Sequence, residues 1–288
     1  SGCSPSVTAT LPLCSVSPSA SVKIGSTTLL ARYAIDDNYS VFGGLNRYTL
    51  NDGDSVTTLS GYYEIDAADK TLPTLGAAYE RKEIALKVEL IYQPDGSVDV
   101  PTGSSLSKLI PTTPLSGASI AFPETTTLNF QSGVAEDTLI YGAIHQGKWS
   151  TAQIIVPENP NGINPATGAA DAAVSAIGSS FDDKIHYTIG VGRKISEDLA
   201  LSISYATEDG GGAETSDPFT FRNGYETYSI SARYTASENL TVSAGYTYTV
   251  AGDVKIVHEA APGVPSGLTL DYTDNNVSGF GFKIGYTF

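Results

Sequence analysis

The sequence predicts an all-β protein, an antiparallel transmembrane β-barrel, on the strength of three observations. Apolar and polar residues alternate with a period of two along eleven segments. The connections between these segments are alternately short and long, and aromatic residues gather at the segment ends. Helical periodicity is not convincing anywhere in the chain.

The eleven segments are the expected strands of the barrel. In chain order they lie near 24–35, 39–50, 72–80, 83–93, 122–133, 138–149, 184–194, 198–207, 224–235, 239–250 and 275–288. The alternation is clear in 83–92, whose apolar face carries Ile84, Leu86, Val88, Leu90 and Tyr92. In 239–250 the second face is small and polar, as a water-accessible or ligand-accessible lumen requires, and consists of Thr241, Ser243, Gly245, Thr247 and Thr249.

The lengths of the connections sort them onto two ends of the barrel. The short links are 35–38, 80–83, 133–137, 193–198 and 235–239, and the long ones are 51–71, 94–121, 150–183, 208–223 and 251–274. Outer-membrane barrels have short periplasmic turns and longer extracellular loops. A soluble sandwich would not be expected to sort its loops in this way.

Aromatic residues are expected at both membrane interfaces of such a barrel. If the short turns are periplasmic, the inner group comprises Tyr33, Tyr39, Tyr79, Tyr234, Tyr286 and Phe288. The outer group comprises Tyr48, Tyr92, Trp149, Tyr187, Tyr205 and Tyr248. Tyrosine is also a good strand former, but that property does not explain its position at segment ends.

Composition excludes several other classes of protein. The 288 residues are 41% hydrophobic, their mean hydropathy is −0.05, and no run of about 18 uncharged apolar residues occurs, which excludes a helical membrane protein. The net charge of −15 argues against nucleic acid as a partner. Because the chain has no methionine, we expect it to be a mature or trimmed product.

Two regions are expected: a Ser/Pro-rich extracellular segment over 1–20 and the barrel wall over 21–288. The first contains Cys3 and Cys14, with no histidine or second cysteine pair nearby. Zinc needs about four ligands and a catalytic thiol needs a base, so we expect a disulfide between them. A disulfide favours an oxidising compartment.

Eleven strands pose a problem of parity, because single-chain bacterial barrels have an even number. An open edge in hydrocarbon would leave backbone groups without partners, at several kcal/mol each. Either a further strand lies around 6–14 or within 56–65, or N-terminal strands lie outside this sequence.

Several segments resemble the FadL-type outer-membrane transporters of long-chain fatty acids and other hydrophobic compounds. FPETTTLNFQSGVAEDTLIYGAIHQGKWS, at 122–150, resembles a strand–turn–strand stretch of that family, and 184–208 and 224–250 resemble its next two hairpins. The closing GFGFKIGYTF resembles the family's last strand, whose Tyr-x-Phe signal, here Tyr286 and Phe288, is read by the barrel assembly machinery. The resemblance covers roughly 21–288.

The resemblance implies a fourteen-stranded barrel in the bacterial outer membrane, with an N-terminal hatch. The segment 24–35 corresponds to the fourth strand, so the hatch and the first three strands have no counterpart in this sequence. The implied function is a channel for passive uptake of hydrophobic molecules such as long-chain fatty acids. The implied partners are the lipid bilayer, lipopolysaccharide, hydrophobic small molecules and the assembly machinery.

Candidate ligand-binding residues follow from the lumenal face. Leu139 and Tyr141 give segment 138–149 an apolar inner wall, or they pack against a plug, and His145 follows on the same segment. Lys87 and Arg233 point into the lumen by alternation and could hold a carboxylate; the alternative for Lys87 is an ion pair with Glu89. Lys283 lies among glycines, where it could contact a ligand or the hatch.

Other functions have weaker support. His145, His186 and His258 lie on different segments, and no nucleophile–base–acid grouping is visible, so we expect no enzyme, no cofactor and no metal. Glu208, Asp209, Glu214 and Asp217 could share a divalent cation with lipopolysaccharide, or simply be a solvated loop. A surface or adhesion barrel and an aqueous porin with a charged constriction remain alternatives.

Overall fold

The computed structural model describes residues 19–51, 54–58, 61–105, 114–157, 176–212, 214–215, 223–257 and 269–286. Its regular elements are β-strands and two short 3-10 helices. No helix in these ranges is long and apolar enough to cross a membrane.

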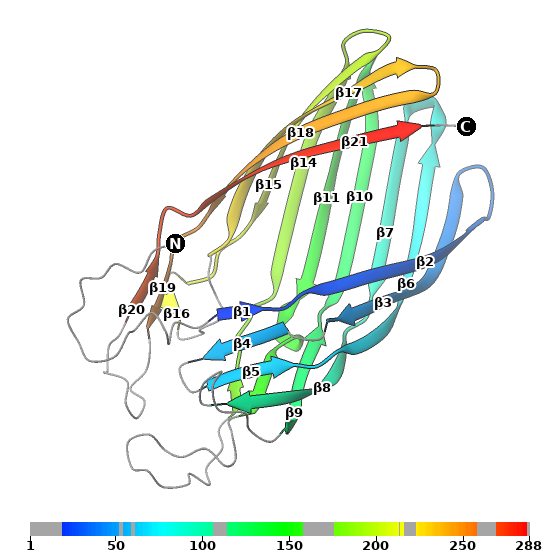
Figure 1. The fold of residues 1–288 in the computed structure, drawn as a ribbon. Coiled ribbons are helices and arrows are strands. Elements are labelled where there is room, and N and C mark those ends of the chain that lie inside the picture. The colour runs from blue at the N-terminus through cyan, green and yellow to red at the C-terminus, as the bar shows by residue number, and fades with distance from the viewer. Residues whose placement is uncertain are drawn as a thin grey trace, which may run out of the picture.

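Eleven strands form one antiparallel sheet, which we call the wall (Figure 1). Consecutive wall strands are hydrogen-bonded neighbours. Their order is β2 (Ile24–Ala34), β3 (Tyr39–Leu50), β6 (Ala68–Arg81), β7 (Leu86–Gln93), β10 (Glu124–Ala135), β11 (Thr138–Lys148), β14 (Lys184–Lys194), β15 (Leu199–Glu208), β17 (Tyr225–Ser237), β18 (Leu240–Ala251) and β21 (Asn276–Tyr286).

The all-β prediction and all eleven predicted strands are confirmed, with differences at some ends. β6 begins at Ala68, four residues before the predicted start. β7 begins only at Leu86, because a 3-10 helix, η2 (Lys82–Ile84), forms the turn before it. That turn closes through Ala85, whose φ of 50° is in the left-handed region.

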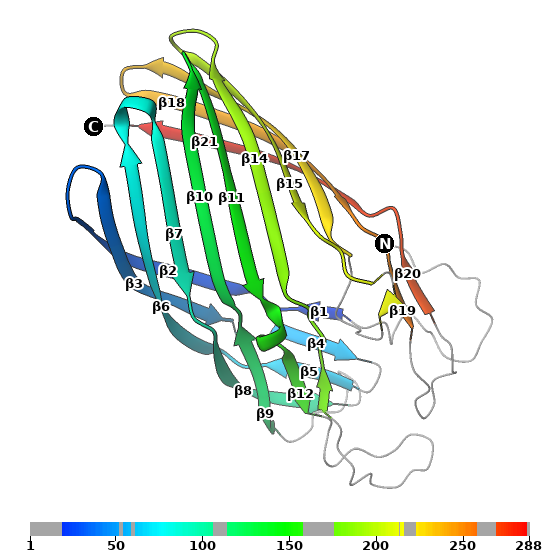
Figure 2. The same ribbon diagram turned by 180° about the vertical axis from the view of Figure 1, so that it is seen from behind.

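The wall is strongly curved, and Figures 1 and 2 show its edge strands β2 and β21 on the side opposite β10 and β11. Side chains of one face meet across one or two intervening strands. Arg32 on β2 reaches Glu89 on β7, with Nη2 2.5 Å from Oε2, and the Tyr48 hydroxyl on β3 donates to Gln93 Oε1 on β7 at 2.9 Å. This face is therefore concave, and the opposite face is convex.

The convex face is an exposed apolar band. Leu29 is 77% exposed and lies opposite Leu45. A continuous row of apolar side chains also crosses the strands β15, β17, β18 and β21, formed by Ile203, Ile230, Tyr246 and Phe280. A water-soluble protein rarely exposes an apolar surface of this extent, so the band is suited to contact with lipid.

Most of the aromatic residues predicted at the two membrane interfaces have the expected orientation, toward the convex face. At the turn end of the wall, Tyr39 and Tyr79 pack together on the convex face, with ring centroids 4.9 Å apart. The outer prediction is wrong for Tyr48. Because it alternates with convex Arg47 and Thr49, Tyr48 points to the concave face, where it stacks on Phe122 with centroids 4.5 Å apart.

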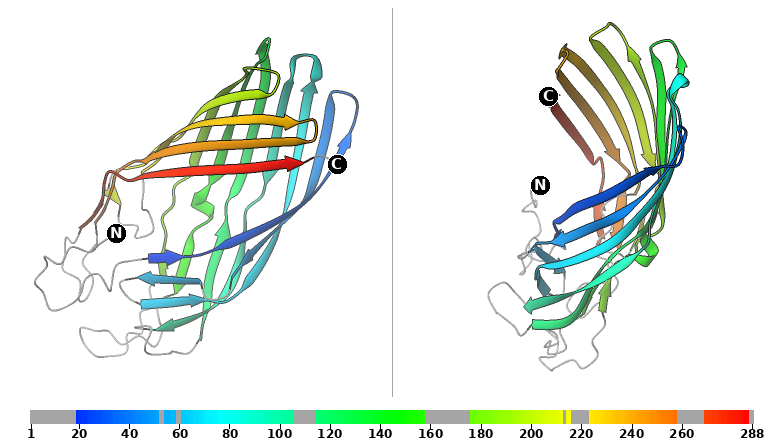
Figure 3. Two further views of the ribbon diagram at one scale, coloured as in Figure 1. Left: turned by 45° about the horizontal axis from the view of Figure 1, so that its top comes forward. Right: turned by 90° about the vertical axis from the view of Figure 1, so that its right-hand side faces the viewer.

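The wall is not closed. β2 and β21 are the two edges of the sheet and do not pair with each other (Figure 3). Residues 56–65, considered above as a missed wall strand, contain strands that belong to a different sheet. Residues 6–14 lie outside the described part of the chain.

A second sheet of seven strands continues the wall strands beyond their loop ends. Its order is β1 (Ser19–Ser21), β4 (Asp54–Thr58), β5 (Gly61–Ile65), β8 (Gly96–Ser105), β9 (Pro114–Phe122), β12 (Ile154–Pro157) and β13 (Ala176–Gly178). Each strand of the second sheet directly precedes or follows one wall strand in the chain. The second sheet therefore has the same order as the seven wall strands from β2 to β14. The connections 51–71, 94–121 and 150–183, expected only as long loops, therefore contain strands of this second sheet.

A hydrophobic core holds the second sheet against the concave face of the wall. Leu50 and Leu72 from the wall pack with buried residues of the second sheet, namely Ile65, Val100, Ile120 and Phe122. Leu50 is completely buried. Because Leu50 and Leu72 point to the concave side, the second sheet leans over that side of the wall.

Two smaller features complete the loop end. β16 (Glu214–Thr215), β19 (Val254–Val257) and β20 (Thr269–Tyr272) form a three-stranded sheet in which Lys255 pairs with Glu214 at 3.0 Å, and this contact raises the pKa of Lys255. Asp183, before β14, accepts hydrogen bonds from the hydroxyl and the amide of Ser150, which lower its pKa.

Some predictions fall outside the described residues. These concern the disulfide between Cys3 and Cys14, the segment 1–18 around it, Asp217, His258 and Phe288. Tyr286, the other half of the predicted assembly signal, ends β21 with its side chain on the convex face, 59% exposed. Its role in assembly stays a prediction.

The assignment of the two faces predicts a difference between neighbouring arginine substitutions on β17. Ile230→Arg places a charge in the middle of the convex band and should lower the free energy of unfolding by about 2–4 kcal/mol in lipid bilayers. Ser229→Arg, on the concave face, should cost less than about 1 kcal/mol. Denaturant unfolding in phospholipid vesicles measures both; equal costs would contradict the assignment.

The core between the two sheets predicts a second effect. Leu50→Ala removes a fully buried side chain and should cost about 2–5 kcal/mol of unfolding free energy. Cleavage within the second sheet by a protease added from the loop side should become faster as well. Leu50→Met, which nearly conserves volume, serves as the control and should cost less than about 1.5 kcal/mol. A stable, protease-resistant Leu50→Ala variant would show that the core does not hold the sheet.

Candidate functional site

A groove of about 790 Å³ lies on the concave face at the turn end of the wall, and we call it the turn-end groove. Leu139 and Tyr141 of β11 supply its apolar side. Ser202 of β15 and Ser231 of β17 lie opposite, joined by a hydrogen bond of 2.7 Å between their hydroxyls. Arg233 of β17 lies at the end nearest the turns.

The groove owes its shape to side chains and turns that fit against glycines. The ring of Tyr141 lies over Gly190 on the neighbouring strand, where a Cβ atom would collide with the ring. The η2 turn comes so close to Gly133 that a Cβ there would lie 2.9 Å from the carbonyl oxygen of Ile84. The small residues therefore allow the turn and the ring to line the groove.

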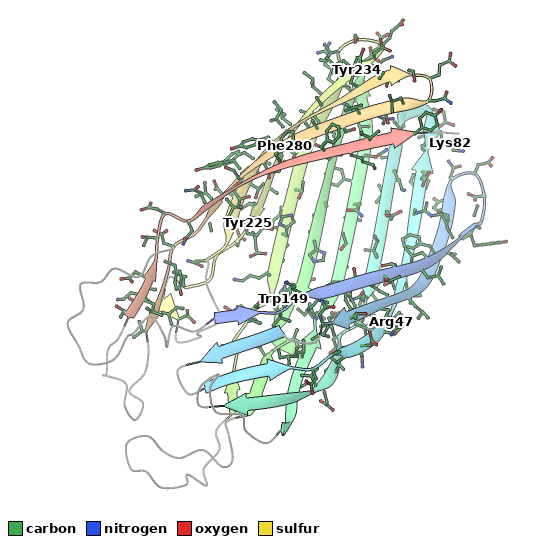
Figure 4. All side chains as sticks on the ribbon, viewed as in Figure 1. Arg47, Lys82, Trp149, Tyr225, Tyr234 and Phe280 are labelled. Carbon is green, nitrogen blue, oxygen red and sulfur yellow. The ribbon has the colours of Figure 1, made fainter. Side chains whose placement is uncertain are left out.

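A row of cations crosses the concave face at the level of the groove. Successive strands align Lys194 with Ala200, Ala200 with Arg233, and Arg233, through Ser243, with Lys283. Among the described residues, no carboxylate lies within ion-pair distance of these three cations, and all three are exposed. The row therefore offers cations without ion pairs beside an apolar surface, although Glu83 and Asp137 also line the groove. Figure 4 shows this end of the wall near Lys82 and Tyr234.

Lys87 is in a different electrostatic setting. Its Nζ lies 3.3 Å from Glu89 and 3.5 Å from Glu80, and both carboxylates also contact Arg32. The Arg32 guanidinium packs over the ring of Phe42, 5.0 Å from its centroid. The alternative reading of Lys87 as a member of an internal ion pair is therefore the one that the contacts favour. The network connects the edge strand β2 to β7 across two intervening strands.

A row of hydrogen-bonded polar residues lies nearer the loops. His145 and His186 are directly opposite each other on β11 and β14. His145 Nδ1 is 2.7 Å from the hydroxyl of Thr127, and His186 Nδ1 is 2.6 Å from the hydroxyl of Tyr225. In the described ranges, no three of the histidine, cysteine, aspartate and glutamate side chains are arranged to hold a metal ion.

The predicted site residues thus fall into three groups. Leu139, Tyr141 and Arg233 share the turn-end groove, and Lys283 extends its row of cations. Lys87 and Glu89 belong to the ion-pair network, and His145 belongs to the polar row. The prediction missed Lys194, Arg32, Glu80, His186 and Tyr225 as site residues. Alternation applied to the ends of segments 24–35 and 184–194 would have found Arg32 and Lys194; the other contacts depend on strand register.

Comparisons with known proteins establish the fold. No family model matches the chain, and no curated protein matches its sequence. Among solved structures, a FadL homologue of Pseudomonas aeruginosa has a TM-score of 0.63 at 12% identity, covering 91% of this chain and 67% of that one. The Ralstonia pickettii toluene transporter TbuX has a TM-score of 0.52 at 10% identity, covering 93% and 68%. The Pseudomonas putida toluene transporter TodX has 0.52 at 11%, covering 79% and 64%.

These similarities confirm an outer-membrane β-barrel fold of the FadL type. At 10–12% identity, these similarities show a shared fold but do not identify a substrate. The chain spans about two thirds of the length of each of these three proteins.

The ion-pair network should contribute more to the free energy of unfolding than an exposed ion pair at the surface does. Glu89→Gln leaves Arg32 and Lys87 without one of their shared carboxylates and should cost about 1–2 kcal/mol of unfolding free energy, with less effect at high salt. Glu83→Gln is the control: Glu83 is 74% exposed and 4.0 Å from Arg81, so its loss should cost less than about 0.5 kcal/mol. Equal costs for the two variants would contradict a stabilising role of the ion-pair network.

Proposed function

We propose that the wall belongs to a bacterial outer-membrane channel that takes up hydrophobic molecules passively, long-chain fatty acids among them. The observation that carries the proposal is the turn-end groove, where the apolar side chains of Leu139 and Tyr141 lie beside Arg233, a cation with no ion pair to any described residue. An apolar surface with a small number of placed polar groups is typical of a site for a small amphipathic ligand. The FadL-type fold, shared with two toluene transporters, supports the same class of function.

A channel of this kind solves a physical problem. Lipopolysaccharide hinders the partition of apolar molecules into the outer leaflet, and a water-filled pore gives them little affinity. A protein surface that is apolar but sheltered from bulk water provides both affinity and a path. The small Gly, Ser and Thr side chains on the concave faces of β14, β15, β17, β18 and β21 leave room beside the groove for such a path.

The two alternative functions, an aqueous porin and a surface or adhesion barrel, would require other features of the concave face. An aqueous porin requires a charged constriction, whereas four of the concave charges, those of Arg32, Glu80, Lys87 and Glu89, neutralise one another. A surface or adhesion barrel requires a lumen blocked by side chains, and the turn-end groove is open space. Both alternatives therefore fit the concave face less well than a channel for hydrophobic molecules.

Uptake into liposomes tests the proposal. The protein should carry a labelled long-chain fatty acid across the bilayer faster than it carries a small sugar. Arg233→Gln should slow the fatty acid about three- to tenfold through loss of a charge-assisted hydrogen bond. It should leave uptake of an uncharged aromatic hydrocarbon unchanged, whereas Leu139→Asp should slow both ligands.

Arg81→Gln is the matched control, because it removes a cation from the same end of the wall but from the convex face. Faster passage of the sugar would favour the aqueous porin. No passage of any solute by correctly folded protein would favour the surface barrel.

A further inference from the structure

In the described wall strands, the charged side chains of the convex face lie toward the strand ends, and one group of them lies at the loop-side border of the apolar band. Along β3 the convex side chains are Tyr39, Val41, Gly43 and Leu45, followed by Arg47. Along β11 they are Ile140, Gly142, Ile144 and Gln146, followed by Lys148. Figure 4 shows Arg47 at this end of the wall. The cations therefore lie where the hydrocarbon ends and headgroups begin.

Each of these two cations is held by a carboxylate on the neighbouring strand. Arg47 donates to Asp69 through Nε at 3.3 Å and through Nη2 at 2.7 Å, and Thr49 donates to the same carboxylate at 2.8 Å. Lys148 pairs with Glu124, which also accepts from the Tyr92 hydroxyl at 3.1 Å. These contacts fix the positions of two long side chains that would otherwise be mobile.

Both Arg47 and Lys148 have N–H donors that their carboxylate partners do not use. The Arg47 Nη1 group makes no hydrogen bond among the described residues, and the side chain is 61% exposed. The Lys148 ammonium has three N–H donors, one of which faces Glu124, and the side chain is 45% exposed. Guanidinium and ammonium groups with free donors bind phosphate through charge-assisted hydrogen bonds.

We propose that Arg47 and Lys148 are phosphate-binding positions for the headgroups of outer-leaflet lipopolysaccharide. The lipid is the source of phosphate because both side chains project from the lipid-facing side of the wall, directly above its apolar band. The two positions are separated by four strand intervals, roughly 19 Å, so each would bind a phosphate of its own.

The inference does not depend on what the channel carries. Lys255 offers a matched comparison, because it is 41% exposed and pairs with Glu214 at 3.0 Å. It belongs to the three-stranded sheet at the loop end and not to the wall. It therefore resembles Lys148 in exposure and pairing but not in its relation to lipid.

Native mass spectrometry of the full chain, titrated with bisphosphorylated lipid A, tests the proposal. Arg47→Gln combined with Lys148→Gln should weaken binding about tenfold. Lys255→Gln should change it less than about twofold. Lipid A without phosphates should bind the unaltered protein about tenfold more weakly than the bisphosphorylated form.

A second pair of substitutions tests the proposal in the opposite direction. Asp69→Asn combined with Glu124→Gln removes the competing carboxylates and should strengthen binding about threefold or more. Heat-modifiable mobility in gels verifies folding of each variant, and this second pair keeps the test decisive if the first pair does not fold.

Three outcomes would overturn the proposal. One is binding that does not depend on the lipid phosphates, and another is an equal loss of binding in the Lys255→Gln variant. The third is displacement of lipid A by an equimolar amount of inorganic phosphate, which would identify free phosphate as the ligand.

Discussion

The structure depends on one constraint: in a sheet that separates lipid from a lumen, every strand must satisfy its backbone hydrogen bonds sideways while its side chains alternate between two environments. The lateral pairing is seen in the continuous ladder from β2 to β21. The alternation places Ile230 in the apolar band and its neighbours Ser229 and Ser231 on the concave face. A shift of register by one residue would exchange these environments, so the pattern fixes the register as well as the fold.

This constraint explains which parts of the fold could be predicted from the sequence. The wall strands carry a strong period of two because lipid tolerates few polar side chains, and all eleven were found. In the second sheet, five of the seven strands have five residues or fewer, too few to show a strong period of two. Pairs such as Ile65 with Thr102 join residues far apart in the chain. Its hydrophobic core depends on these distant contacts. Tyr48 was misplaced for a related reason, because an aromatic residue near the end of a strand fits a membrane interface and a core equally well.

The candidate site likewise has features that the sequence predicts and features that only the three-dimensional structure shows. Alternation predicts that Lys87, Arg233 and Lys283 face the lumen, but it does not tell which of them already have partners. Only the register and curvature bring Arg32 and Glu80 to Lys87 and leave Arg233 and Lys283 without a carboxylate partner among the described residues. The difference between a structural cation and one available to a ligand is therefore a tertiary property. The pairing of His145 with His186 is a further case, since it depends on which residues of β11 and β14 stand opposite each other.

The core between wall and second sheet has a mechanical consequence. Seven wall strands continue into the second sheet after short breaks, and Leu50, Leu72 and Phe122 fill the angle between the two sheets. Swinging the second sheet away from the wall would expose this core to water, so it is a rigid overhang and not a hinged lid. If the protein is the proposed channel, a molecule arriving from the loop side must pass around this sheet, which covers one part of the wall. In the proposed channel, the way inward from the loop side is therefore set by fixed architecture and lies over β15, β17, β18 and β21, which among the described residues do not continue into the second sheet.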